Sequence, residues 1–290
     1  MSDTRLVPPP ALLYEPVVRR ALREDLGVAG DLTTEAIVAP DVQATGVVAA
    51  RSPGRVAAVT VAARAFTLLD RRVGVRPVVE DGKDVDAGQA LAVVDGPAPA
   101  LLTAERAALN LLSHLCGVAT ATRDVVTAVA ASGARVVATR KTTPGLRGLE
   151  RYAVRAGGGA DHRFGLDDAV LIKDNHLVVA GSIAEAVDRV RRRVGHLVKI
   201  QVEVDRLDQL DAALAAAVDA VLLDNLPLDV LREAVRQASG HVVLEASGRI
   251  TAQTAPDVAA TGVDLLSVGW LTHSASALDI GLDLRTVTAA

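Results

Sequence analysis

The fold of this chain is decided by three short runs in its second half: "LVKIQVEVD" (197–205), "AVLLDN" (220–225) and "HVVLEASG" (241–248). Each run is rich in β-branched and apolar residues, which predicts a strand buried on both faces, as in a parallel sheet. Their carboxylates, Glu203, Asp224 and Glu245, follow one another at intervals of 21 residues, and we place each at the C-terminal end of its strand. This period indicates stacked β/α units, which close into a barrel more readily than they form an open sheet.

Three further runs have the same character: "RVVATRK" (135–141), "AVLIKDNH" (169–176) and "LLSVGW" (265–270). Helical patterns separate several of the runs, and the one that starts at Ser182 begins with a residue typical of helix N-caps. In a parallel barrel the C-terminal ends of the strands meet at one rim, where the chemistry takes place. We therefore expect a site at this rim. The alternative is that Asp224 and Glu245 only cap the helices that follow them.

The composition argues against several classes of protein. The chain has 290 residues and a formal net charge of −4, whereas a sequence-independent nucleic-acid binder is usually basic. Cys116 is the one cysteine, so no intramolecular disulfide can form, and we interpret it as a packing residue in a reducing compartment. There is no signal core and no apolar run of about 18 residues. We expect a soluble, cytoplasmic protein without nucleic-acid or membrane partners.

The first half of the chain mixes short strands, turns and long helical patterns, and the composition changes near Gly117. The stretch "EDGKDVDAGQALAVVDG" (80–96) is similar to the turn-rich β-sandwich of lipoyl and biotinyl carriers. Lys83, however, lies inside an Asp-Gly turn and not in a separate exposed hairpin, which favours a shared architecture over a carrier site. We predict two domains: residues 1–116, with 274–290 packing back on them, and residues 117–273.

Cationic residues from separate loops are expected at the barrel rim: Arg140, Lys141, His162, Arg163 and Lys173. An arginine fork matches carboxylate or phosphate oxygens in pairs, and a lysine acts as a compact charge. Crowded cations repel one another unless an anion compensates them, so the pattern favours a highly charged anionic substrate. The alternative is a structural ion network with neighbouring acids, Asp161, Asp167, Asp168 and Asp174.

Glycines and carboxylates add to this picture. The triad Gly157–Gly159 permits unusual backbone conformations, and we expect it to let the chain pass close to the site. Ser247-Gly248 and Gly269 end the last two strand runs, where barrels often bind phosphate through loop amides. Glu203 and Asp224 lack a third zinc-type ligand, but they could hold a hydrated Mg²⁺ that also touches phosphate.

Motifs along nearly the whole chain, from "LREDLGVAGDLTTE" (22–35) onward, resemble those of the quinolinate phosphoribosyltransferase family: "TAERAALNLLSHLCGVATAT" (103–122), "TRKTTPGLRGLERYAVRAGGGADHRFGLDDAVLIKDNH" (139–176), "VEVD" (202–205), "LLDN" (222–225), "EASG" (245–248) and "SVGWLTHSASALDIGLDL" (267–284). The resemblance implies an α/β fold, with an N-terminal α/β sandwich domain, a C-terminal incomplete (β/α) barrel, and a homodimer with shared sites. It also implies the reaction of quinolinate with phosphoribosyl pyrophosphate. The products are nicotinate mononucleotide, pyrophosphate and CO₂, formed with Mg²⁺ in de novo NAD synthesis.

The same resemblance implies roles around the pyridine ring. Arg106 matches an arginine that the partner subunit contributes to the quinolinate pocket. Arg140 and Arg163 match the arginines that grip the two carboxylates, and His162 matches the histidine beside them. Cys116, where serine is expected, departs from the family pattern without touching a proposed catalytic group.

Further roles concern the phosphoribosyl group. Lys141 and Lys173 match cations that face the carboxylate and the phosphoribosyl group. Glu203 and Asp224 match acids that hold the ribose hydroxyls and Mg²⁺–pyrophosphate, so the predicted catalytic set is Lys141, Lys173, Glu203 and Asp224. The residues that match the 5′-phosphate loops are Ser247, Gly248 and Gly269, and Arg249 departs from the small residue expected beside them.

Three alternatives stay open at this point. A paralogue of the same fold, such as the molybdenum-transport-associated proteins, would act on a different base. A barrel lyase would form a Schiff base on Lys173. A carrier or anion-binding protein would bind the substrate without releasing pyrophosphate.

Overall fold

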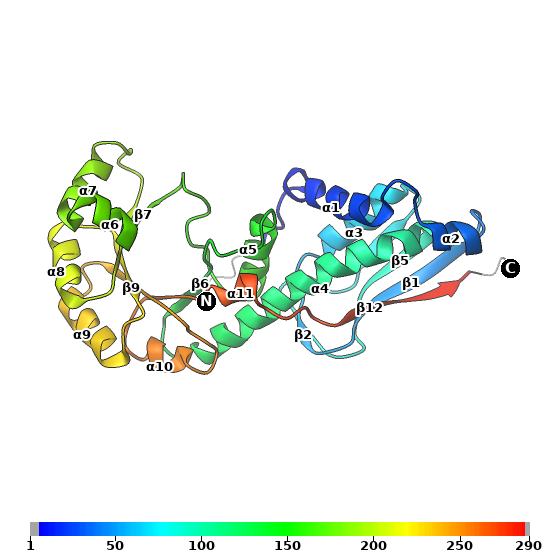
Figure 1. Ribbon diagram of the computed structural model, residues 1–290. Coiled ribbons are helices and arrows are strands. Elements are labelled where there is room, and N and C mark those ends of the chain that lie inside the picture. Colours follow the sequence, from blue (N-terminus) through cyan, green and yellow to red (C-terminus); the bar gives the residue numbers. More distant parts are fainter. Residues whose placement is uncertain (1–5, 288–290) are drawn as a thin grey trace. The chain divides into compact units, whose positions relative to one another are not determined.

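The computed structural model describes residues 6–287, which form two compact units (Figure 1). Unit 2 takes residues 124–141 and 159–270, and unit 1 takes the other described residues, including the internal segment 142–158. Helix α4 (Ala98–Ala128) runs without a break through position 116, where we predict the domain boundary, and that boundary stays a prediction. No described helix combines the length and the apolar character needed to cross a membrane.

Unit 2 is built on one parallel sheet. Its strand order is β6-β11-β10-β9-β8-β7. The strands are β6 (Arg135–Val137), β7 (Val170–Ile172), β8 (Ile200–Val204), β9 (Ala220–Asp224), β10 (Val243–Ser247) and β11 (Leu265–Ser267). Every one of them lies within a run identified in the sequence. The end strands β6 and β7 do not pair with each other among the described residues, so the predicted incomplete barrel is confirmed.

Helices cover the outer face of this sheet (Figure 1). They are α6 (Asp174–Ala180), α7 (Ile183–Arg191), α8 (Leu207–Ala215), α9 (Leu228–Ala238) and α10 (Ala255–Ala259), while α11 (Trp270–His273) follows the last strand. Ser182 caps α7 by accepting a hydrogen bond from the backbone N–H of Glu185 at 3.2 Å. Pro227 directly precedes α9, where its fixed φ suits the start of a helix.

Unit 1 contains an antiparallel sheet of order β12-β1-β5-β3 and a short pair, β2-β4. The strands are β1 (Gln43–Ala50), β2 (Gly54–Arg55), β3 (Gly74–Pro77), β4 (Asp84–Val85), β5 (Ala90–Pro97) and β12 (Ile280–Thr286). Every second residue of β1 is buried, so one face of this sheet lies against the core. Within unit 1, strand β12 near the C-terminal end of the described residues pairs antiparallel with β1 over Ile280–Thr286. The predicted domain that includes segment 274–290 stays a prediction.

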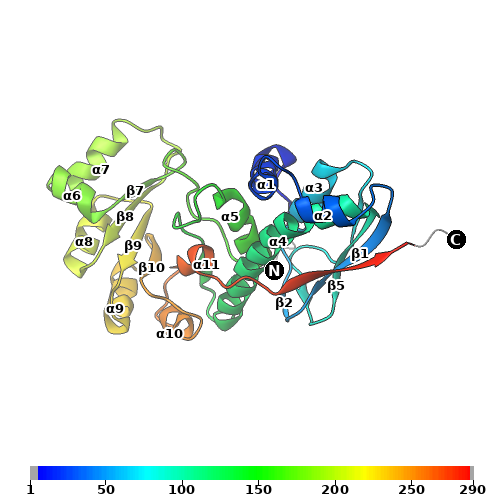
Figure 2. The ribbon, with the colours of Figure 1, turned by 45° about the vertical axis from the view of Figure 1, so that its right-hand side comes forward.

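The helices of unit 1 are α1 (Ala11–Leu26), α2 (Leu32–Ile37), α3 (Val59–Leu69), α4 and α5 (Arg147–Ala156). Helices α3 and α4 pack on the buried sheet face, where Phe66 and Leu112 are each about 1% exposed (Figure 2). Cys116 on α4 is fully buried, and burial raises the pKa of its thiol to about 12, which supports the packing role inferred from the sequence.

Helix α5 joins unit 1 through buried polar contacts. Glu150 is fully buried and accepts hydrogen bonds from His114 Nε2 at 2.8 Å and from the backbone N–H of Thr143 at 3.0 Å. Tyr152 donates to Asp81 at 2.6 Å. His114 is therefore a structural residue.

Candidate active site

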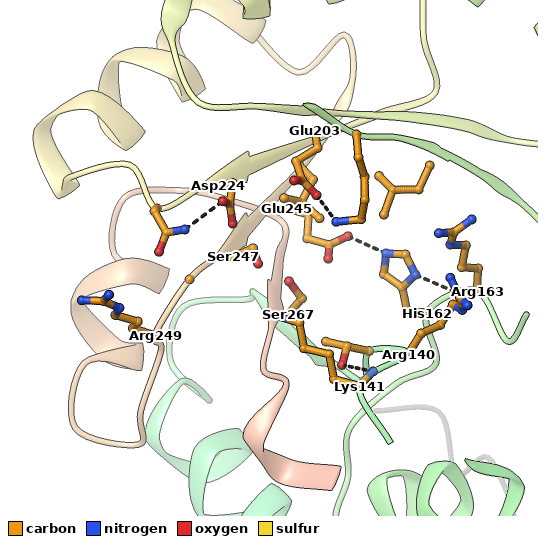
Figure 3. Close-up of a pocket in the computed structure, with 16 residues that line it drawn as sticks. Arg140, Lys141, His162, Arg163, Glu203, Asp224, Glu245, Ser247, Arg249 and Ser267 are labelled. Carbon is orange, nitrogen blue, oxygen red and sulfur yellow. Dashed lines mark hydrogen bonds and ion pairs between the residues drawn. The ribbon is translucent and has the colours of Figure 1, made fainter. Parts of the chain in front are cut away.

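A cavity of about 570 Å³ opens at the C-terminal ends of the unit 2 strands (Figure 3). Nine residues predicted from the sequence line it: Arg140, Lys141, His162, Arg163, Lys173, Glu203, Asp224, Ser247 and Gly248. Strand pairing brings them together across large separations in sequence, because residues in register on parallel strands point to the same face. Asp224, for example, is in register with Ser247, and Ser247 is in register with Ser267.

Two predicted residues lie elsewhere. Gly269 is not part of the cavity lining; it lies two residues beyond the end of β11, just before α11. Arg106 lies on α4 in unit 1, where its side chain is 66% exposed and its guanidinium is 3.9 Å from Glu105. Arg106 is therefore not among the residues of this chain that line the cavity.

Two expectations from the sequence were wrong. The triad Gly157–Gly159 does not line the cavity: a Cβ on Gly157 would lie 2.5 Å from the carbonyl oxygen of Ala119, so this glycine allows a close approach to α4 instead. Glu245 does not end its strand or cap a helix, because it occupies the centre of β10 and is only 1% exposed. The 21-residue period identified a position in β10 whose side chain faces the cavity, and the strand ends two residues later, at Ser247.

Glu245, which the sequence placed in the carboxylate series at the rim, also lines the cavity. Sequence reasoning missed the rest of the lining: Thr139, Leu171, Leu222, Asn225, Arg249 and Ser267. Thr139 has a clear local role, since its hydroxyl accepts a hydrogen bond from the backbone N–H of Lys141 at 3.0 Å. Leu222 is in register with both Glu203 and Glu245, which places the three on one face of the sheet. The spacing of the carboxylates is the signal that identified Glu245 in the sequence.

Cations outnumber carboxylates in the cavity, although the whole chain is acidic. Five Lys/Arg side chains and three Asp/Glu side chains line it. Burial, and then the charge of the nearby Arg140, lower the pKa of the Arg163 guanidinium, while Asp168 opposes them. Two guanidinium groups held close together in a partly buried place favour binding of an anion.

The loop that carries Arg163 is held by its own backbone contacts. Asp168 accepts hydrogen bonds from the backbone N–H groups of Phe164, at 2.5 Å, and Gly165, at 2.9 Å. The Nη1 of Arg163 donates to the carbonyl oxygen of Ala169 at 3.2 Å. The carboxylate of Asp168 thus shapes the loop that carries Arg163.

On the opposite side of the cavity, acids meet a lysine and an amide (Figure 3). Lys173 Nζ donates to Oε2 of Glu203 at 2.5 Å, and Asn225 donates to Oδ2 of Asp224 at 2.8 Å. Lys173 and Glu203 thus form an ion pair within the cavity lining.

Gly248 closes this side of the cavity in a conformation reserved for glycine. Its φ is +113°, and an added Cβ would lie 2.3 Å from Oδ1 of Asn225. Arg249 follows with a φ of +50°, so the chain makes a tight turn directly after β10. Turns of this kind can bind a phosphate group through backbone amides, and both residues line the cavity.

The site can be compared with known proteins. Family models described as the N-terminal and C-terminal domains of quinolinate phosphoribosyl transferase match residues 31–116 and 118–283. The nicotinate-nucleotide pyrophosphorylase (carboxylating) of Mycobacterium leprae is 46% identical over 275 residues, which cover 92% of this chain and 95% of that protein.

Solved structures agree with these matches. NadC from Streptococcus pyogenes has a TM-score of 0.93 and 36% identity, over 97% of this chain and 100% of that one. The nicotinate-nucleotide pyrophosphorylase from Francisella tularensis has a TM-score of 0.92 and 35% identity, over 98% and 100% of the two chains. The resemblance inferred from the motifs is confirmed, and the chain belongs to the quinolinate phosphoribosyltransferase family.

Proposed function

We propose that the unit 2 cavity is where this quinolinate phosphoribosyltransferase joins quinolinate to the ribose of phosphoribosyl pyrophosphate, in the synthesis of NAD. The observation that carries the assignment is the excess of cations over carboxylates in one cavity of an acidic chain. Both substrates are highly charged anions, and their combined carboxylates and phosphates match this excess. The remaining proposals concern the role of each side chain.

Arg140 and Arg163 would hold the two carboxylates of quinolinate. Each guanidinium offers a planar fork that fits a carboxylate with two hydrogen bonds. Lys141, presented by the turn at Thr139, would add a third positive charge beside them. These contacts would position the pyridine nitrogen for attack without any covalent bond to the protein.

The acids and the turn after β10 would hold the phosphoribosyl group. Glu203 and Asp224 would accept hydrogen bonds from ribose hydroxyls, while Lys173 would face the phosphate oxygens. Ser247 and the amides at Gly248 would bind the 5′-phosphate. Gly269 would support the same phosphate from the next strand, a role taken from the family resemblance.

The chemistry follows from these positions. The C1–pyrophosphate bond breaks as the ribose gains oxocarbenium character, and the pyridine nitrogen forms the new bond to C1. Pyrophosphate leaves with the electrons of the broken bond, and fixed cations stabilise its charge. The nitrogen is then cationic, so the adjacent carboxylate can leave as CO₂. A proton replaces it on the ring carbon and gives nicotinate mononucleotide.

We also propose a Mg²⁺ that is held mainly by pyrophosphate and water. Among residues 6–287 no group of three or more His, Cys, Asp or Glu side chains could hold a metal by itself. One carboxylate oxygen of Glu203 accepts a hydrogen bond from Lys173, and one of Asp224 accepts a hydrogen bond from Asn225. The second oxygen of each carboxylate could bind the ion, because Mg²⁺ commonly uses one or two carboxylates besides substrate phosphates. When bound, the ion would neutralise charge on the leaving group.

A homodimer with shared sites is the proposal for Arg106. Its exposed side chain on α4 would enter the quinolinate pocket of a second copy of this chain. A cytoplasmic location remains a prediction, supported by the single cysteine.

One assay tests the proposed function directly. The protein is incubated with quinolinate, phosphoribosyl pyrophosphate and Mg²⁺, and nicotinate mononucleotide, pyrophosphate and CO₂ should appear in equal amounts. Substrate binding without pyrophosphate release would instead support an anion carrier. Trapping of a carbonyl substrate on Lys173 by borohydride would support the lyase and reject our assignment.

A further inference from the structure

Behind the arginines of the cavity lies a buried polar group made of Gln201, Glu245 and His162. Gln201 is 8% exposed and Glu245 is 1% exposed. Gln201 Nε2 donates to Oε2 of Glu245 at 2.8 Å. His162 Nε2 lies 3.2 Å from the same Oε2 and 3.1 Å from Oε1 of Gln201. These residues come from β8, β10 and the segment before β7, so only the folded sheet brings them together.

The hydrogen bonds determine where His162 carries its proton. The backbone N–H of Arg163 donates to Nδ1 of His162 at 2.7 Å, so Nδ1 acts as an acceptor and carries no hydrogen. The amide nitrogen of Gln201 points to Glu245, which leaves its oxygen facing His162. Both groups near Nε2 are therefore acceptors, and the proton lies on Nε2.

The geometry of Glu245 agrees with this assignment. Its Oε2 already accepts the hydrogen bond from Gln201 Nε2, and the same oxygen faces Nε2 of His162, so it acts as an acceptor toward the ring.

We propose that Glu245 is a positioning residue, which with Gln201 holds His162 as the neutral Nε2–H tautomer. His162 in turn fixes the backbone at Arg163, and it links Glu245 to that arginine (Figure 3). Because both ring nitrogens have partners within the protein, His162 acts by positioning Arg163 and not by transferring a proton to the substrate. This inference rests on the proposed function only in naming quinolinate as the substrate that Arg163 holds.

The tautomer can be measured without any activity. The chain has six histidines, so ring-¹⁵N-labelled histidine gives a simple NMR spectrum, in which His162→Gln identifies the signals of His162. The wild-type protein at pH 7 should show a protonated Nε2 and a bare Nδ1, and Glu245→Ala should give averaged shifts of two exchanging tautomers. A proton on Nδ1 of the wild-type protein, alone or together with one on Nε2, would overturn the proposal.

Kinetics separates positioning from proton transfer. Asparagine places an oxygen near the position of Nδ1, so His162→Asn keeps the acceptor for Arg163 but cannot titrate. We expect this variant, and Glu245→Gln, to raise KM for quinolinate about tenfold while kcat changes less than about tenfold. An acid–base role predicts a loss in kcat of about 10²- to 10⁴-fold, which would refute the proposal. Glu185→Gln on the exposed face of α7 is the matched control.

The two proposals fail in different ways. If the wild-type protein does not turn over quinolinate, the proposed function is wrong, whatever the tautomer of His162. If quinolinate is turned over but the NMR spectrum shows Nδ1 protonated, only the role of Glu245 is wrong.

Discussion

At the scale of single residues, Arg163 carries its positive charge close to Arg140, on a loop that is held in place by hydrogen bonds. Its pKa is lowered by burial and by Arg140, and its backbone is held by His162. Arg163→Lys keeps the charge and loses the planar fork. Loss of one or two charged hydrogen bonds, each about 1.5–3 kcal/mol, should lower kcat/KM for quinolinate about 10- to 100-fold or more.

Steady-state kinetics at several quinolinate concentrations measures this loss, and circular dichroism checks that the fold is retained. Arg193→Lys, at an exposed position after α7, is the control and should behave as the wild type. If Arg163→Lys were as efficient as the wild-type protein, Arg163 would not hold a carboxylate.

Substrate choice is decided by the same residues. Nicotinate lacks the carboxylate next to the ring nitrogen, and its binding would leave a partly buried arginine without the carboxylate that it is proposed to hold. Unpaired buried charge is costly, so we expect kcat/KM for quinolinate to exceed that for nicotinate by at least about 10²-fold. The ratio of the two kcat/KM values is measured by assaying pyrophosphate release with each base in parallel. Comparable values would contradict a pocket that binds two carboxylates.

At the scale of elements, α2 shows how a short helix depends on its cap. It has six residues, and Asp31 accepts hydrogen bonds from Thr34 N at 3.0 Å, Thr34 Oγ1 at 2.6 Å and Thr103 Oγ1 at 2.9 Å. Asp31→Ala should therefore lower the free energy of unfolding by about 1 kcal/mol at pH 7. Asp41→Ala, at an exposed position before β1, is the control.

The cap should also depend on pH. Hydrogen bonds from Thr34 lower the pKa of Asp31 below its ordinary value of 3.8 in the folded protein. A lowered folded-state pKa means that the stabilisation is fully present above the unfolded pKa and is lost as the pH falls through the folded pKa. Denaturant unfolding at pH 7, 5 and 3 should show the gap between wild type and Asp31→Ala narrowing only below about pH 4. A constant gap would show that the charge of Asp31 is not involved.

At the scale of the whole molecule, the open question is whether a site is completed by a second chain. If it is, each site needs its own Lys141 and its neighbour's Arg106. Arg106→Ala and Lys141→Ala homodimers should both be nearly inactive. In a mixed dimer one site carries both changes and the other carries neither, so about half of the wild-type activity per mixed dimer should return.

The two variants are co-expressed with different tags, and the mixed dimer is purified through both tags before the assay. Random mixing makes about half of all dimers mixed, so about a quarter of all sites should recover in the unpurified mixture. Folded mixed dimers that stay inactive would show that Arg106 does not act in a partner's site.

The parallel sheet of unit 2, the family and most of the cavity lining could be predicted from the amino-acid sequence. Buried parallel strands are continuous apolar runs, so β8, β9 and β10 can be located from composition alone. Polar residues that follow such strands must gather at one rim, which is why Lys173, Asp224 and Ser247 could be named in advance. These features depend on local patterns and on a general rule of barrel geometry.

The contacts between residues far apart in the sequence could not be predicted and are seen only in the folded chain. The tertiary structure placed Glu245 inside β10 beside Gln201 and His162, and it assigned α5 to unit 1 through Glu150 and His114. Strand register and side-chain direction determine which buried polar atoms meet, and a sequence pattern contains neither. The 21-residue spacing therefore could not show that Glu245 is buried. The same spacing is expected for a residue at the rim and for a residue two positions earlier in the strand.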